Sequence, residues 1–156
     1  MKSILTALFL FSGVIVTAQQ VDVPVQINLK DGGTIDAKHF GQLKCGTATY
    51  MDNYIFIKGM FMNNVTEITN FKDIEKIVLE GYVAQPGASA GNEKGTLIIY
   101  RKNGKVFTLE DAEIIMSCYS TGSKYNQIVV QIENPITDKV AETTINTNTI
   151  HSIIFK

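Results

Sequence analysis

The 156-residue sequence has no tryptophan, only two cysteines, three prolines and no excess of either charge. Its formal net charge is −1, which becomes −2 if Lys2 is removed with a leader. A chain so close to neutrality lacks the basic surplus with which nucleic-acid binders and polybasic membrane anchors reach phosphates. Hydrophobic residues make up 45% of the chain and charged residues 19%, so this composition excludes extended disorder.

Long apolar runs are also missing, apart from one at the N-terminus. Ile4–Val16 is an uncharged, mostly apolar stretch that follows Lys2, and it is shorter than the ~20 residues of a membrane-spanning helix. Small or modest side chains then lead to Ala18, so we predict a signal peptide over residues 1–18 that is cleaved after Ala18, with an uncleaved anchor as the alternative. No cysteine follows for lipid attachment, and the Ala18-Gln19-Gln20 junction resembles exported proteins of Gram-negative bacteria. We therefore expect the protein in the periplasm, on the outer surface or secreted.

Leucine is scarce in the mature chain, whereas β-branched residues are abundant. From Gln19 onward there are 18 isoleucines, 10 valines and 13 threonines, but only 5 leucines. Branched side chains are restricted in helices and pack well on a pleated sheet. The composition therefore predicts an all-β protein.

The strongest strand signal runs over residues 21–29, where apolar and polar residues alternate. Pro24 cannot donate a ladder hydrogen bond, so we expect this strand at a sheet edge near its start. Turns are predicted at Lys30–Gly33 and Arg101–Gly104, because an Asp or Asn followed by Gly tolerates the positive φ of tight hairpins.

The two halves of the mature chain carry a similar order of signals. Lys30-Asp31-Gly32 aligns with Lys102-Asn103-Gly104, and an Ile-x-x-Ile pattern closes each half. Between them, residues 82–95 are rich in Gly and Ala without periodicity, which predicts a linker between lobes at 19–81 and 96–156. Each half resembles small five-stranded barrels of the SH3-like or Sm-like kind, which implies two barrel-like or meander lobes in tandem. Chance similarity of two β-meanders is the alternative.

Two single-barrel architectures also fit the length. An outer-membrane barrel is rejected, because most apolar runs are too short, tryptophan is absent and the chain ends in Lys156. A lipocalin-like barrel that carries a small apolar ligand lacks the glycine-x-tryptophan signature of that family. It remains the alternative to the two-lobe prediction.

The only cysteines, Cys45 and Cys118, lie one in each half at nearly equivalent places of the proposed repeat. In an oxidising compartment they are candidates for a disulfide that joins the halves, with two buried free thiols as the alternative. A redox-active pair is not predicted, because there is no Cys-x-x-Cys motif.

No set of residues with a recognisable catalytic or metal-binding spacing is present. His39 and His151 are isolated, and the acidic residues Glu110, Asp111 and Glu113 lack the spacing of a calcium loop. No nucleotide or cofactor motif follows Asp31-Gly32-Gly33. We therefore favour a non-catalytic protein and predict no cofactor, although active sites can unite residues that are distant in sequence.

One stretch has the composition of an interaction surface. Met60, Phe61 and Met62 precede polar turn residues, and they would form an adaptable apolar patch if exposed or a strand end if buried. The strand over residues 21–29 is a second candidate, through its predicted edge. Together these features predict a binding or structural role in the cell envelope, with an envelope protein or a glycan as partner and no nucleic acid.

Overall fold

The computed structural model describes residues 23–38, 40, 42–44, 52–84, 93–118, 124, 125 and 127–156, so the predicted signal peptide lies outside the described residues. The described elements are strands with one 3-10 turn, which confirms the all-β prediction. No described helix is long and apolar enough to cross a membrane. The elements are β1 Val25–Leu29, β2 Thr34–Ala37, β3 Gln42–Lys44, β4 Asp52–Phe61, β5 Asn64–Ile68, β6 Ile74–Ala84, β7 Glu93–Arg101, β8 Val106–Cys118, β9 Lys124–Tyr125, β10 Gln127–Glu133, β11 Val140–Asn146, η1 Thr147–Thr149 and β12 Ile150–Phe155.

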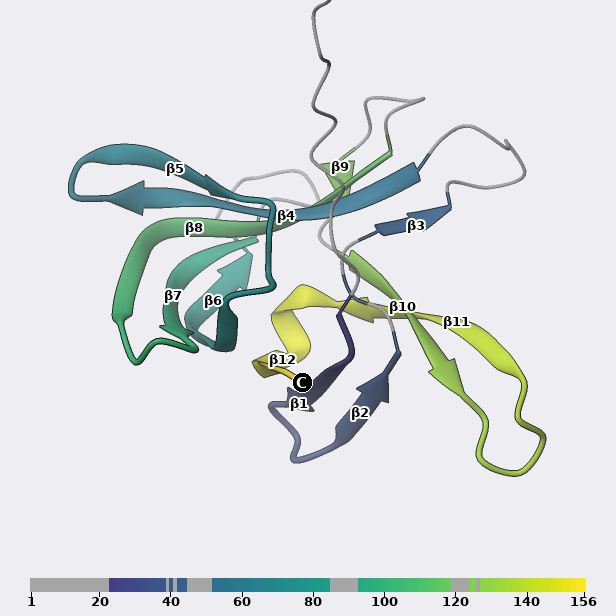
Figure 1. The fold of residues 1–156 in the computed structure, drawn as a ribbon. Helices are drawn as coiled ribbons and strands as arrows, with labels where there is room; N and C mark the ends of the chain where they lie inside the picture. The colour runs from purple at the N-terminus through teal and green to yellow at the C-terminus, as the bar shows by residue number, and fades with distance from the viewer. Residues whose placement is uncertain are drawn as a thin grey trace, which may run out of the picture.

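Ten of these strands form one antiparallel sheet in the order β2-β1-β12-β6-β7-β8-β4-β3. Strand β5 pairs with β4, and β9 pairs with β8. Strands β10 and β11 form a separate two-stranded sheet, a hairpin that projects from the rest of the molecule (Figure 1). The described strands thus make a curved, open sheet with one hairpin beside it, and they form no closed barrel.

The sheet joins the two halves of the chain, which differs from the predicted pair of separate lobes. Strand β1 from the first half pairs with β12 from the second, and β4 pairs with β8. Strands β6 and β12, which carry the two Ile-x-x-Ile patterns, lie side by side in the middle of the sheet. The partners of these strands come from distant parts of the sequence, which local patterns do not specify.

The predicted linker over residues 82–95 is wrong at both of its ends, while residues 85–92 lie outside the described residues. Strand β6 continues to Ala84, β7 begins at Glu93, and Val83 pairs with Lys94. A Cβ on Gly95 would lie only 2.7 Å from the Tyr82 Cα, so this glycine allows two backbones to approach closely. Glycine at this position therefore permits a tight strand pairing rather than a linker.

The predicted edge position of the first strand is also wrong. Strand β1 lies between β2 and β12, so both of its edges are paired. Pro24 precedes the first paired residue, Val25, and its carbonyl accepts a hydrogen bond from the Lys156 N–H at 2.9 Å. The proline therefore needs no edge, because it lies just outside the ladder.

Both predicted Asx-Gly turns are present, and they share one hydrogen-bond pattern. In the first, the Leu29 N–H donates to the Gly33 carbonyl and the Gly32 N–H to the Leu29 carbonyl. In the second, the Arg101 N–H donates to the Lys105 carbonyl and the Gly104 N–H to the Arg101 carbonyl. Gly32 and Gly104 have φ values of 91° and 79°, which explains the preference for glycine.

One face of the sheet carries the core. Alternate residues of the central strands point inward, so that Ile27, Ile153, Ile77 and Ile99 lie side by side across β1, β12, β6 and β7. Phe155 stacks on Phe71, and Phe40 packs edge-on against both rings. The inner end of the projecting hairpin is tied to this core by buried Ile128, Val130 and Ile145.

Candidate functional site

Two of the three buried polar side chains among the described residues, Glu93 and Thr147, gather around Tyr82. Tyr82 and Thr147 are fully buried, and Glu93 is only 9% exposed. The Thr147 hydroxyl donates to a Glu93 carboxylate oxygen at 2.6 Å and also bonds to the Tyr82 hydroxyl. We call these three residues the Tyr82 cluster, and it joins β6, β7 and η1.

A break in the strand ladder explains why a tyrosine hydroxyl is needed there. Strands β7 and β8 pair irregularly beyond Leu97, where Asp111 has a φ of 48°. The Ile114 N–H beyond this break donates to the Tyr82 hydroxyl at 2.8 Å. Burial raises the pKa of Tyr82 to about 12, because the phenolate form loses its hydration. The neutral hydroxyl thus supplies a hydrogen-bond partner inside the protein.

The geometry of the Tyr82 cluster supports a structural role. Each group bonds to another member or to a strand, and the Lys30 ammonium donates to the Tyr82 carbonyl at 3.0 Å. Buried polar groups that satisfy one another fix the relative placement of the elements that carry them. The cluster therefore holds strands from both halves of the chain in one arrangement.

The other polar residues singled out in the sequence lie apart from this cluster or outside the described residues. His39 is outside them, and His151 is exposed on β12. Asp111 forms an ion pair with Lys94 at 2.9 Å, and this hydrogen bond raises the pKa of the half-buried lysine. Within the described part of the chain, no group of three or more His, Cys, Asp or Glu residues could hold a metal ion.

The predicted disulfide stays a prediction. Cys45 lies outside the described residues. Cys118 is the last residue of β8, and its backbone pairs with Asn53 of β4.

The predicted apolar patch over residues 60–62 is divided by the β4–β5 turn. Met60 and Phe61 are half-buried, and Phe61 packs edge-on against Phe107 with ring centroids 5.8 Å apart. Met62 is 79% exposed at the turn itself. Met62 and Asn63 have φ values of 48° and 63°, a backbone conformation that methionine rarely adopts. Only Met62 is therefore fully presented to solvent.

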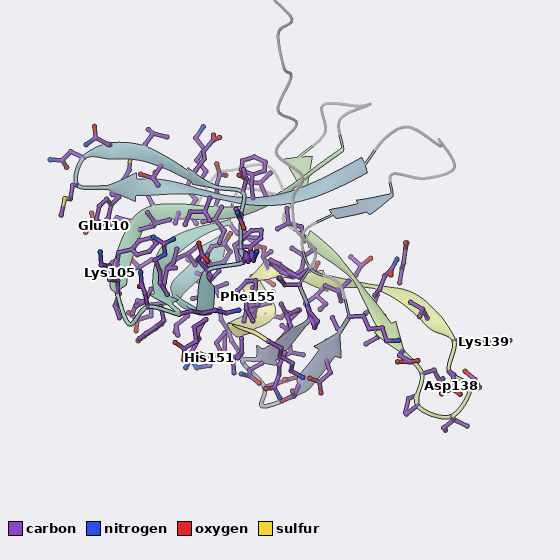
Figure 2. All side chains as sticks on the ribbon, viewed as in Figure 1. Lys105, Glu110, Asp138, Lys139, His151 and Phe155 are labelled. Atoms are coloured by element: carbon purple, nitrogen blue, oxygen red, sulfur yellow. The ribbon has the colours of Figure 1, made fainter. Side chains whose placement is uncertain are left out.

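A second exposed apolar side chain lies at the tip of the β10–β11 hairpin, residues 134–139, which we call the hairpin tip. Ile136 is 89% exposed, the highest value among the large hydrophobic residues described. Figure 2 shows Asp138 and Lys139 at the far end of this hairpin, away from the sheet. The hairpin tip thus presents an aliphatic side chain well clear of the core.

Hydrogen bonds within the hairpin tip fix its conformation. The Asn134 side-chain oxygen accepts from the N–H groups of Ile136 and Thr137 at 2.9 and 3.2 Å. The Asn134 N–H donates to the Lys139 carbonyl, and the Asp138 N–H donates to the Asn134 carbonyl, both at 2.9 Å. The exposed Ile136 therefore sits on an ordered turn.

The hairpin tip is not among the interaction surfaces predicted from the sequence. An asparagine that bonds to backbone N–H groups two and three residues later is a recognised turn signal. A large aliphatic residue inside such a polar turn, as in Asn134-Pro135-Ile136-Thr137-Asp138, was the available clue.

Comparisons with protein-family models, curated proteins and solved structures found no match to this chain. Its function must therefore be inferred from its own residues.

Proposed function

We propose that this is an exported β-protein that binds another protein of the cell envelope through the hairpin tip. The observation that carries the proposal is the 89% exposure of Ile136 on a turn that Asn134 holds in shape. Removal of an aliphatic side chain from water is favourable, so Ile136 gains free energy when a partner covers it. A non-catalytic binding role is the function that this geometry supports best.

Preorganisation adds to the affinity that such a tip can reach. A loop that is already in its bound conformation avoids the free-energy cost of ordering on association. Val140, 49% exposed at the start of β11, is a second exposed apolar side chain on the same hairpin. Charged neighbours such as Asp138 and Lys139 surround it, which matches an interface with an apolar centre and a polar rim.

The chemistry of the hairpin tip favours a protein over a glycan as the partner. Aliphatic side chains such as Ile136 and Val140 match an apolar pocket between protein side chains. The described hairpin tip has no aromatic ring to stack on a sugar. A glycan partner is the competing outcome of the test.

Site-specific photocrosslinking in the exporting cell tests this proposal. A photoreactive residue at position 140 should yield a discrete adduct that protease degrades and glycosidases leave intact. Ile136→Asp should reduce the amount of adduct at least ~10-fold, because a charge replaces the aliphatic side chain that the partner would cover. Thr137→Asp, which places the same charge on the adjacent residue, should reduce it far less. Equal adducts in both variants, or an adduct sensitive only to glycosidases, would contradict the proposal.

Export itself is tested by the N-terminus of the protein recovered from cells. The signal peptide predicts a mature chain that begins at Gln19 and is found outside the cytoplasm. Recovery of an intact Met1 terminus in the cytoplasmic fraction would overturn the cellular location on which the proposal depends.

A further inference from the structure

The sheet face opposite the core carries apolar residues, although it is directed away from the core. Strand alternation places Lys76, Val78 and Glu80 of β6 on this face, because Ile77 and Leu79 point into the core. Ile98 of β7 pairs with Val78 and therefore lies on the same face. Lys76 lies between its two pairing partners, Tyr100 of β7 and Ile154 of β12, which share this face as well. We call these six residues the outer face. Val78, Ile98, Tyr100 and Ile154 are half-buried there.

Charge on the outer face is separated by sign along the strands. Lys76 lies at one end, where the β7–β8 turn adds Lys102 and Lys105. Glu80 lies at the other end, and Glu110 of β8 is exposed beyond core residue Leu109. Figure 2 labels Lys105, just before β8, and Glu110, within the first half of β8. Between the ends the row is neutral, with Val78 opposite Ile98 and Ile98 opposite Thr108.

The two charges that β6 places on the outer face, Lys76 and Glu80, have no ion-pair partner within the described part of the chain. Lys76 lies over the Tyr100 ring, with its ammonium 5.9 Å from the centroid, but no described carboxylate pairs with it. Glu80 likewise has no ion-pair partner among the described residues. Both charges are thus available to a partner of complementary pattern.

From this pattern we infer that the outer face binds a second copy of this chain, sheet against sheet. A two-fold axis that lies between the sheets and crosses the strands at Val78 reverses the strand direction in the second copy. Lys76 of each copy then faces Glu80 of the other, and Val78 meets its own copy. The neutral row lies at the axis, and each basic end covers an acidic end.

The other two-fold arrangement is unfavourable. An axis parallel to the strands places each Lys76 against its own copy and each Glu80 likewise. Like charges brought together at an interface weaken association strongly. The separation of positive and negative charge along β6 therefore favours only the first of the two orientations. It also makes the outer face complementary to its own copy, as a closed two-fold dimer requires. This inference stands independently of the partner proposed for the hairpin tip.

A charge-swap series measured by sedimentation velocity tests the dimer. The mature exported protein should dimerise with a Kd in the micromolar range. Lys76→Glu and Glu80→Lys should each raise the Kd at least ~10-fold, since each creates two like-charge contacts. The double variant carries the reversed pattern and should return to within about threefold of the wild-type Kd. Lys38→Glu, the same charge change at the exposed residue just after β2, which β1 and β12 separate from β6, should leave the Kd unchanged.

A cysteine at the axis gives a readout that does not depend on the charges. Val78→Cys should form an intermolecular disulfide under mild oxidation, while Tyr100→Cys and the wild-type protein should not. A protein that stays monomeric at ~100 μM, well above a micromolar Kd, would overturn the inference. Single swaps without effect, a double variant that fails to recover, or crosslinking at position 100 but not 78 would do so as well.

Discussion

In both the Tyr82 cluster and the hairpin tip, polar side chains fix the local structure through hydrogen bonds. The cluster is buried, whereas the hairpin tip exposes an apolar side chain to water. In the cluster, buried Tyr82, Thr147 and Glu93 bond to one another and hold distant strands together. At the hairpin tip, Asn134 bonds only to neighbouring backbone and leaves Ile136 in water. In the Tyr82 cluster the buried polar groups join strands, whereas the proposed binding role rests on an exposed apolar side chain.

Gly95→Ala should lower the free energy of unfolding more than any other change proposed here, because the new methyl group would clash with the backbone of Tyr82. The new methyl group would lie 2.7 Å from the Tyr82 Cα and 2.8 Å from the Glu80 carbonyl oxygen, and neither atom can move alone. We expect a loss of about 3 kcal/mol in the free energy of unfolding, measured by urea denaturation. Gly33→Ala meets mainly the Asp31 side chain and should cost under ~0.5 kcal/mol. Equal losses would show that close backbone approach at Gly95 is unimportant.

Tyr82→Phe should lower the free energy of unfolding at pH 7 by about 2 kcal/mol, because the buried Ile114 N–H loses its acceptor. The same tyrosine makes the wild-type protein sensitive to alkaline pH. Its pKa is about 12 in the folded state and 10.0 in the reference state, so its contribution is complete below pH 10 and is lost as the pH rises toward 12.

That alkaline loss should amount to about 2 to 3 kcal/mol. Denaturation curves at pH 9 to 12 should show it in the wild-type protein and in Tyr100→Phe, but not in Tyr82→Phe. A loss of the same size in Tyr82→Phe would contradict the buried, hydrogen-bonded position of the Tyr82 hydroxyl.

Asn134→Ala should act on the hairpin tip alone. Loss of two side-chain hydrogen bonds should cost about 1 kcal/mol locally, with a smaller change in global unfolding. Hydrogen exchange should become faster at the amides of Ile136 and Thr137 and stay unchanged at Ile114. Thr144→Ala, in an exposed position of β11, should leave all three amides unchanged. Faster exchange at Ile114 would show that the two regions are coupled.

Met62→Asn should give the smallest effect, a gain of about 0.5 kcal/mol in the free energy of unfolding. Asparagine tolerates the φ of 48° at this turn better than methionine does. Met62→Leu keeps the unfavourable backbone preference and should leave stability unchanged. A loss of stability in Met62→Asn, measured by thermal melting, would indicate that the methionine side chain packs against the protein.

Local features of the fold could be predicted from the sequence, and the long-range pairing could not. Alternation located β1, and the Asp31-Gly32 and Asn103-Gly104 pairs located two turns. The pairing of β1 with β12 depends on packing between the two ends of the described chain, which no local pattern encodes. The roles of Pro24 and Gly95 could not be predicted locally, because they depend on which distant segment lies beside each residue.

The candidate sites were harder to predict than the strands. The Met60–Met62 patch was found from its composition, but only the fold shows that Met62 alone is fully presented. Glu93 and Thr147, which are 54 residues apart, meet through the pairing of distant strands. The sequence contains a signal for the outer face. The apolar runs Leu97–Tyr100 and Ile153–Phe155 are continuous rather than alternating, which is typical of strands that are covered on both faces.

Backbone order at the hairpin tip tests the central claim most directly, because an ordered tip with an exposed Ile136 is the basis of the proposed binding role. NMR relaxation of the mature protein should give order parameters near ~0.85 for the amides of Ile136, Thr137 and Asp138, equal to those of the central strands. Values below ~0.6 at these three amides would show a flexible loop and would contradict the account.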